Sequence, residues 1–127
     1  MVLVLAFVFE VLCYCLDQSL TSRVHKMIYA VIGLGSIGKR HLNVAKRIQG
    51  RVGITAIRGV DTNPGRREEV ASSIDGVEVF ADLAQAVEGA EIVVVCTPTA
   101  SHIDLCNAIC EHADPHIFIE KPLSHTL

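Results

Sequence analysis

The chain has 127 residues, of which half are apolar and a fifth are charged, and this composition excludes an intrinsically disordered protein. A chain of this length suffices for one domain with a single hydrophobic core. Eleven Lys and Arg against 14 Asp and Glu give a formal net charge of −3, which argues against nucleic-acid binding and against a polybasic membrane-surface protein. Five cysteines, an odd number without a CxxC pair, favour a reducing compartment, so we predict a cytoplasmic protein.

Residues 1–26 differ in composition from the rest of the chain. Between Met1 and Leu16 only Glu10 is charged. This run fits a secretory signal poorly, because no Lys or Arg precedes it and no small-residue cleavage site follows it. It is also shorter than the roughly 20 residues that a membrane-spanning helix needs. Signal peptide and anchor stay open as alternatives, but we favour an N-terminal extension, since a complete strand and glycine turn begin at Met27.

From Met27 onward, short apolar runs alternate with amphipathic segments. Strands are predicted at 27–32, 52–60, 77–80, 92–96 and 116–120, and helices at 36–49, from Pro64 onward, at 82–88 and at 101–112. The first helix is expected to end at Gly50, and Arg58 makes the second strand too polar for complete burial. The alternation predicts an α/β fold over 27–127, a Rossmann-type doubly wound parallel sheet of about five strands. Its binding crevice should lie at the carboxyl ends of the strands.

The strongest chemical signal is the glycine-rich segment Gly33-Leu34-Gly35-Ser36-Ile37-Gly38. It directly follows a predicted buried strand and opens a predicted helix, which is the context that makes a GxGxxG pattern informative. Gly33 would permit the tight turn, Gly35 the approach of a pyrophosphate, and Gly38 the close packing of helix on strand. Ser36 and Ile37 would begin the helix whose N-terminal N–H groups face the phosphates. A glycine turn without a ligand is the alternative.

An acidic residue follows at the spacing that a dinucleotide site requires. Asp61 lies 61 − 38 = 23 residues after the last glycine, at the end of the second predicted strand. Its carboxylate can accept hydrogen bonds from the ribose hydroxyls of adenosine and repel a 2′-phosphate, so NAD is the predicted cofactor. Arg66 and Arg67 leave NADP open, because a nearby guanidinium can receive a 2′-phosphate; a solvated helix start is the plainer reading of both. The alternative is an Asp61 that only caps the turn at Asn63.

Four motifs in the same order and spacing resemble the glucose–fructose oxidoreductase/inositol dehydrogenase (Gfo/Idh/MocA) family. They are the GxGxxGxxH opening at 33–41, the acid at Val60-Asp61, the TPxxxH turn at 97–102 and the EKP segment at 120–122. The resemblance covers 27–127. It implies the NAD(P)-binding domain of an oxidoreductase that transfers hydride between the nicotinamide and a sugar, polyol or related hydroxyl compound.

The resemblance also implies roles for individual residues. Thr97 and Pro98 would line the crevice beside the cofactor, and His102 would begin a helix that faces the nicotinamide. Lys121 would be the catalytic lysine, and Glu120 with Pro122 would hold its strand end against the cofactor. The alternatives are a solvent-exposed His102 and a surface pair of Glu120 with Lys121.

Two further histidine readings stay open. His41, in the first helix, is expected to support packing or backbone rather than catalysis. His102, Cys106 and Cys110 recur at four-residue intervals and share a helix face. They could contribute to a zinc site, but the sequence shows no fourth ligand, so no metal is predicted.

Members of the family continue into a second domain that carries the substrate pocket, so the resemblance implies a chain truncated before that domain. We therefore expect the chain by itself to be inactive and a sugar or polyol substrate only if a second domain is present; a homo-oligomer stays open. The alternatives are a stand-alone, non-catalytic dinucleotide-binding module and a truncated inactive product. Tight NADH binding without turnover would favour the module.

Overall fold

The computed structural model describes residues 26–123. The predicted N-terminal extension at 1–26 therefore lies outside the described residues, apart from Lys26. No helix among these described residues is long and apolar enough to cross a membrane.

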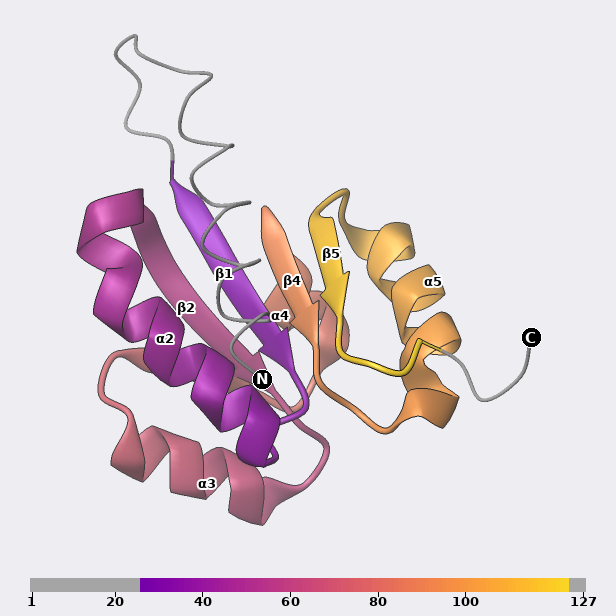
Figure 1. The fold of residues 1–127 in the computed structure, drawn as a ribbon, viewed down its shortest axis with the longest axis horizontal. Helices are drawn as coiled ribbons and strands as arrows, with labels where there is room; N and C mark the ends of the chain where they lie inside the picture. Colours follow the sequence, from indigo (N-terminus) through magenta and orange to yellow (C-terminus); the bar gives the residue numbers. More distant parts are fainter. Residues whose placement is uncertain (1–25, 124–127) are drawn as a thin grey trace, which may run out of the picture.

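One parallel sheet of five strands forms the centre of the fold, in the order β3-β2-β1-β4-β5 (Figure 1). The strands are β1 (Met27–Ile32), β2 (Ile54–Val60), β3 (Val77–Phe80), β4 (Ile92–Val95) and β5 (His116–Ile119). The chain runs outward from β1 to β3 and then returns to the other side of β1 to form β4 and β5. This reversal creates a switch point between β1 and β4, where ligands of doubly wound sheets bind. The predicted fold class is confirmed.

Helices cover both faces of the sheet (Figure 1). They are α2 (Ser36–Val52), α3 (Pro64–Ser73), α4 (Leu83–Val87) and α5 (His102–His112). One core holds Tyr29 and Val31 of β1 with residues of α2 and α3. The other holds Ala30 and Ile32 of β1 with residues of α4 and α5. Successive side chains of a strand point to opposite faces, so a strand covered on both sides must be apolar throughout.

The predicted end of the first helix at Gly50 is wrong. α2 continues to Val52 and ends at Gly53, which has a left-handed φ of 81° and whose N–H donates to the Gln49 carbonyl. Gly50 stays within the helix, because a glycine costs only about 1 kcal/mol there, whereas the left-handed turn needs a glycine. The second strand consequently begins at Ile54 and not at residue 52.

The remaining boundaries shift by about one residue. β4 and β5 end at Val95 and Ile119, one residue earlier than predicted. α5 begins at His102 after a short 3-10 turn at Thr99–Ser101. The cap at Asp82 is confirmed, since its carboxylate accepts from the Gln85 N–H at 3.2 Å.

Arg58, the charged residue of β2, donates hydrogen bonds to the end of a neighbouring helix, α4. Its Nη1 donates to the carbonyl oxygens of Glu88, at 2.7 Å, and Ala86, at 3.3 Å. Both carbonyls belong to the last turn of α4 or the residue after it, where helices leave carbonyls unpaired. The guanidinium also lies over the Phe80 ring, 5.7 Å from its centre. A strand position that borders a helix end can therefore hold a charge.

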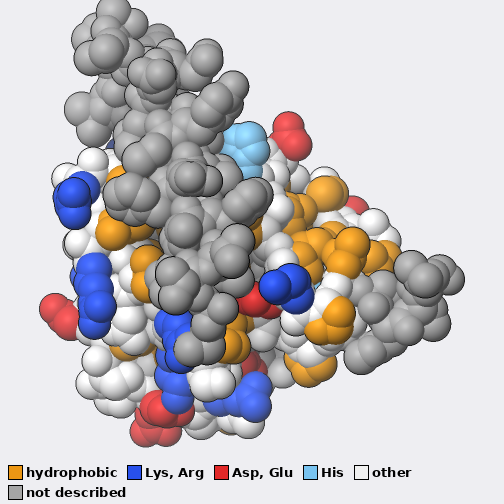
Figure 2. Space-filling view, in the orientation of Figure 1, with side chains coloured by type: hydrophobic (Ala, Val, Ile, Leu, Met, Phe, Trp, Pro, Cys, Tyr) orange, Lys and Arg blue, Asp and Glu red, His pale blue; other side chains and the backbone are white. Residues whose placement is uncertain are grey.

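Side chains of different kinds separate on the face seen in Figure 2. Lys and Arg lie mainly over α2 and α3, whereas apolar side chains gather over β5 and α5. Ile103 of α5 and Leu123, after β5, are each more than half exposed. The apolar surface thus lies next to the end of the described chain.

Candidate functional site

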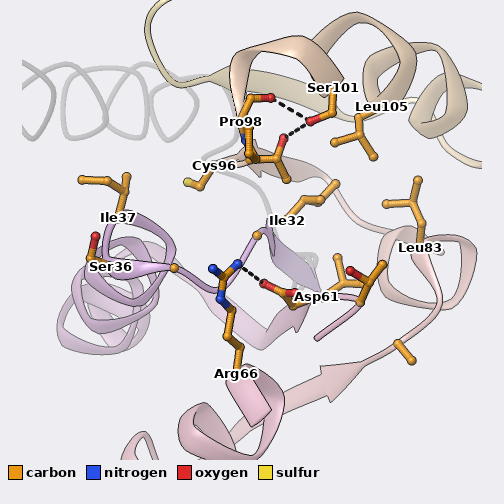
Figure 3. A pocket seen from close by; sticks show the side chains of 16 residues that line it. Ile32, Ser36, Ile37, Asp61, Arg66, Leu83, Cys96, Pro98, Ser101 and Leu105 are labelled. Carbon is orange, nitrogen blue, oxygen red and sulfur yellow. Dashed lines mark hydrogen bonds and ion pairs between the residues drawn. The ribbon is translucent and has the colours of Figure 1, made fainter. Parts of the chain in front are cut away.

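The carboxyl ends of the strands meet at one edge of the sheet and place three loops side by side. The N–H of Gly33 donates to the Val60 carbonyl at 2.9 Å, and that of Cys96 donates to the Ile32 carbonyl at 2.7 Å. The loops after β1, β2 and β4 therefore start at the same level. Between them lies a pocket of about 560 Å³ (Figure 3), a size suited to a small-molecule ligand.

The three glycines of the turn after β1 differ in what a side chain would meet at each position. Gly33 has φ +91°, and a Cβ there would lie 2.9 Å from the Cys96 carbonyl oxygen. A Cβ on Gly38 would lie 1.8 Å from the Gly33 carbonyl oxygen. Gly35, in contrast, lines the pocket and would meet no atom within 4 Å. The fold itself requires the first and third glycines, whereas the second leaves space on the pocket side.

The N-terminus of α2 opens toward this space. Gly35 is its N-cap, so no side chain caps the helix, and its first turn contains no acidic residue. Ser36 and Ile37 line the pocket and are exposed. The free N–H groups and the partial positive charge of a 17-residue helix make this a suitable site for a phosphate group.

Asp61 lies beneath the glycine turn and is almost fully buried. Its Oδ2 accepts from the Leu34 N–H and its Oδ1 from the Asn63 N–H, both at 2.8 Å. Burial would raise the pKa of Asp61, but these backbone donors and the Arg66 guanidinium outweigh it, so the pKa is below its ordinary value. The carboxylate is thus ionised at neutral pH and retains lone pairs for a ligand hydroxyl. It caps the turn at Asn63 as well as lining the pocket.

The two arginines of α3 have different surroundings. Nη1 of Arg66 lies 3.4 Å from Asp61 Oδ2, and its half-exposed side chain lines the pocket (Figure 3). Arg67 points elsewhere, because its Nη1 donates to the carbonyl oxygens of Asp61 and Thr62, at 2.7 and 3.0 Å. Of the two guanidiniums, only that of Arg66 lines the pocket.

The loop after β4 forms the opposite wall. Thr97 and Pro98 line the pocket, and the Ser101 hydroxyl is 2.8 Å from both the Thr97 hydroxyl and the Pro98 carbonyl (Figure 3). Leu83 and Leu105 provide an apolar side facing Ser36 and Ile37 across the pocket (Figure 3).

His102 is buried, with 1% of its surface exposed, so the solvent-exposed alternative is wrong. Its Nε2 donates to the Thr97 carbonyl at 2.8 Å. In a neutral ring Nδ1 is then the acceptor, and it has no partner among the described residues. The ring does not line the pocket. Its contact with the site is instead the hydrogen bond to the backbone of the Thr97–Pro98 turn.

The end of β5 carries the EKP segment. The Glu120 N–H donates to the Val95 carbonyl at 3.0 Å, which continues the pairing of β5 with β4. The Glu120 carboxylate accepts a hydrogen bond from Nε2 of His41 in α2, at 2.7 Å, so within residues 26–123 the partner that the structure shows for it is His41 and not Lys121. Lys121 and Pro122 are exposed and joined by a cis peptide bond.

The structure brings most predicted cofactor-binding residues to one pocket. They are Gly33, Gly35, Ser36, Ile37, Asp61, Thr97 and Pro98. Gly38, His102, Glu120 and Lys121 do not line it. Sequence reasoning missed its apolar side, formed by Ile32, Leu83 and Leu105. The sequence could have indicated Leu83 as a pocket residue, because it lies soon after the end of a strand. It gave no such indication for Leu105, which lies within a helix.

The zinc alternative has no support in the geometry. In the part of the chain that the structure describes, no group of three His, Cys, Asp or Glu residues could hold a metal ion. His102 is instead turned toward the Thr97 carbonyl.

Known proteins resemble the chain in sequence. Inositol 2-dehydrogenase from Rhizobium meliloti is 34% identical over 102 residues, which are 75% of this chain and 28% of that protein. Myo-inositol 2-dehydrogenase from Thermotoga maritima is 34% identical over 103 residues, 80% of this chain and 30% of that protein. The chain thus spans less than a third of the length of these relatives.

The fold also matches a solved dehydrogenase. Scyllo-inositol dehydrogenase from Lactobacillus casei, with bound NAD(H) and scyllo-inositol, superposes with a TM-score of 0.63 at 24% identity, covering 78% of this chain and 29% of that one. The model of the oxidoreductase family with an NAD-binding Rossmann fold (Gfo/Idh/MocA) matches residues 27–127. With the glycine turn, Asp61 and the pocket already in place, this match shows that the chain belongs to the Gfo/Idh/MocA oxidoreductase family and forms its NAD-binding Rossmann domain.

Proposed function

We propose that this chain is the cofactor-binding part of an NAD-dependent dehydrogenase that oxidises a hydroxyl group of a sugar, polyol or related compound. The observation that carries the proposal is the difference among the three glycines: the space beside Gly35 is open, whereas the spaces beside Gly33 and Gly38 are filled by the protein's own backbone. A turn that served folding alone would accept another good N-cap residue, such as Ser or Asn, at the middle position, because a Cβ there would meet no atom.

The residues present fit a dinucleotide. The uncapped N-terminus of α2 would hold the pyrophosphate, because its N–H groups face the open space beside Gly35. Asp61 would accept hydrogen bonds from the ribose hydroxyls with the lone pairs that Leu34 and Asn63 leave free. Leu83 and Leu105 offer apolar surface for a planar base.

When bound, NAD⁺ would supply the hydride acceptor; the substrate carbon that gives up hydride would become a carbonyl, and its hydroxyl proton would pass to water. Lys121, exposed two residues after the end of β5, would serve as the catalytic lysine by donating a hydrogen bond from Nζ to a hydroxyl. His102 would keep Thr97 and Pro98 at the pocket wall, because its ring binds the Thr97 carbonyl. The buried position of the ring favours this positioning role over direct contact with substrate.

Asp61 favours NAD over NADP, since a 2′-phosphate would enter the field of an ionised, buried carboxylate. Arg66 would favour a 2′-phosphate, and so NADP, because its guanidinium lines the same pocket. It also pairs with Asp61, so a 2′-phosphate would have to compete with that carboxylate. We therefore propose NAD as the preferred cofactor.

The test is a fluorescence titration of the chain with NADH and NADPH. NADH should bind more tightly, and Asp61→Ala should weaken NADH binding about 10- to 100-fold, because hydrogen bonds to a charged acceptor contribute about 1.5–3 kcal/mol. Asp61→Asn is the matched control, since it retains an acceptor for the Leu34 N–H but lacks the charge. Equal NADH affinity in all three proteins would refute the ribose assignment.

A second assay addresses turnover. The chain is incubated with NAD⁺ and a panel of inositols and sugars, and absorbance at the NADH wavelength is followed. An increase supports a dehydrogenase, whereas NADH binding without turnover is the result expected both of a cofactor-binding part by itself and of a stand-alone binding module. Failure to bind NADH would refute the proposal.

Location and assembly are also proposals. The three cysteines in the described region are free thiols, which supports a reducing cytoplasm. The exposed Ile103 and Leu123 would favour contact with another domain or subunit, and analytical ultracentrifugation measures self-association directly.

A further inference from the structure

The proposed function leaves His41 without a role, although its ring makes one of the longest-range side-chain contacts in the described chain. His41 lies one turn after Gly38 in α2, and its Nε2 is 2.7 Å from Oε1 of Glu120, 79 residues away in sequence. Their side chains are only 11% and 23% exposed. Because a carboxylate oxygen only accepts, Nε2 carries the hydrogen.

The Glu120 carboxylate also acts on two neutral groups of the sheet, the Cys96 thiol and the Tyr29 hydroxyl. Burial, and then the charge of Glu120, raise the pKa of the Cys96 thiol to about 12. Burial, Cys96 and Glu120 also raise the pKa of Tyr29 above its ordinary value. A partly buried carboxylate is costly unless it is paired, and Cys96 and Tyr29 offer no charge. The hydrogen bond that the structure shows to the Glu120 carboxylate comes from His41.

Glu120 is held at two points. Its backbone N–H donates to the Val95 carbonyl of β4, and its side chain reaches α2 through His41. The next residue is Lys121. The helix that begins at the glycine turn is thus connected, through two side chains, to the residue that precedes the lysine.

We propose that His41 is a positioning residue, which holds Glu120 so that the segment carrying Lys121 keeps a defined place relative to the phosphate-binding helix α2. Its significance for catalysis rests on the proposed function of Lys121. Cofactor binding at the N-terminus of α2 and the position of Lys121 are then coupled, because both depend on the same helix.

The experiment measures amide hydrogen exchange and ¹H–¹⁵N spectra of the full chain, in the wild type and three variants. His41→Leu removes the hydrogen bond, whereas His41→Gln replaces it with an amide N–H. Glu69→Gln is the matched control, since it weakens the contact of Lys39 with Glu69, which connects α2 to α3 instead of β5.

His41→Leu should increase exchange at the Glu120 amide at least tenfold and leave the Val94 amide in β4 unchanged, because the opening is local. It should also abolish most of the NADH-induced shift of the Lys121 amide. His41→Gln should restore both readouts to within threefold of the wild type, and Glu69→Gln should alter neither.

Unchanged Glu120 exchange in His41→Leu would overturn the proposal, as would an equal increase at Val94, which would indicate general destabilisation. Failure of His41→Gln to restore the readouts would also contradict it. If the wild type does not bind NADH, the proposed function fails, while the exchange data still decide whether His41 positions Glu120.

Discussion

Substitution of Gly35 and Gly38 by alanine should separate ligand binding from packing. A methyl group at Gly38 would have its carbon 1.8 Å from the Gly33 carbonyl oxygen, whereas the same group at Gly35 would have no neighbour within 4 Å. The two glycines belong to one turn and the chemical change is identical. A large difference between the variants must therefore come mainly from the atoms that the added methyl group would meet at each position.

The structure sets the expected magnitudes. A backbone oxygen cannot move aside as a flexible side chain can, so Gly38→Ala must shift α2 and should cost about 3 kcal/mol, at the upper end for overpacking. For a domain of this size that corresponds to a fall in Tm of about 12–24 °C. At Gly35 the φ of −70° suits alanine. Gly35→Ala should stabilise the fold by about 0.4–1 kcal/mol, because the unfolded chain becomes less flexible. Alanine is also a poorer N-cap than glycine, and this loss should roughly offset the gain.

The assays are thermal unfolding followed by circular dichroism and an NADH titration of each folded variant. Gly35→Ala should melt within a few degrees of the wild type but bind NADH at least tenfold more weakly, because its methyl group occupies the space proposed for the pyrophosphate. Wild-type affinity in Gly35→Ala would refute that assignment. A Gly38→Ala protein that melts with the wild type would refute the packing argument.

The other predictions concern charges in the fold. Arg58→Leu should lower the free energy of unfolding by about 1–2 kcal/mol, because the carbonyls at the end of α4 lose their donor; the exposed Arg47→Leu should change it by less than about 0.5 kcal/mol in the same denaturant titration. Asp61 has a folded pKa below its ordinary 3.8, so the stability that it contributes is complete above about pH 4 and decreases as pH falls through the folded pKa. Urea unfolding of the wild type and Asp61→Asn should thus differ at pH 7, and the difference should shrink as pH falls below 3.8; a difference independent of pH would contradict this reasoning.

The sequence by itself determined the order of strands and helices from Met27 onward, the glycine turn and the acid at Asp61. These features depend on residues close in the chain. A continuous apolar run indicates a strand covered on both faces, and the GxGxxG pattern depends on its place between a strand and a helix. The error at Gly50 has the same origin, because only backbone conformation distinguishes a glycine within a helix from one that ends it.

The tertiary structure alone decided which distant groups meet. Asp61 accepts from Leu34, 27 residues earlier, and His41 pairs with Glu120, 79 residues later. The apolar pocket wall at Leu105 likewise depends on where α5 packs. Local patterns restrict backbone conformation within a few residues, but contacts between elements depend on strand order and register, which only the packing of the whole sheet determines.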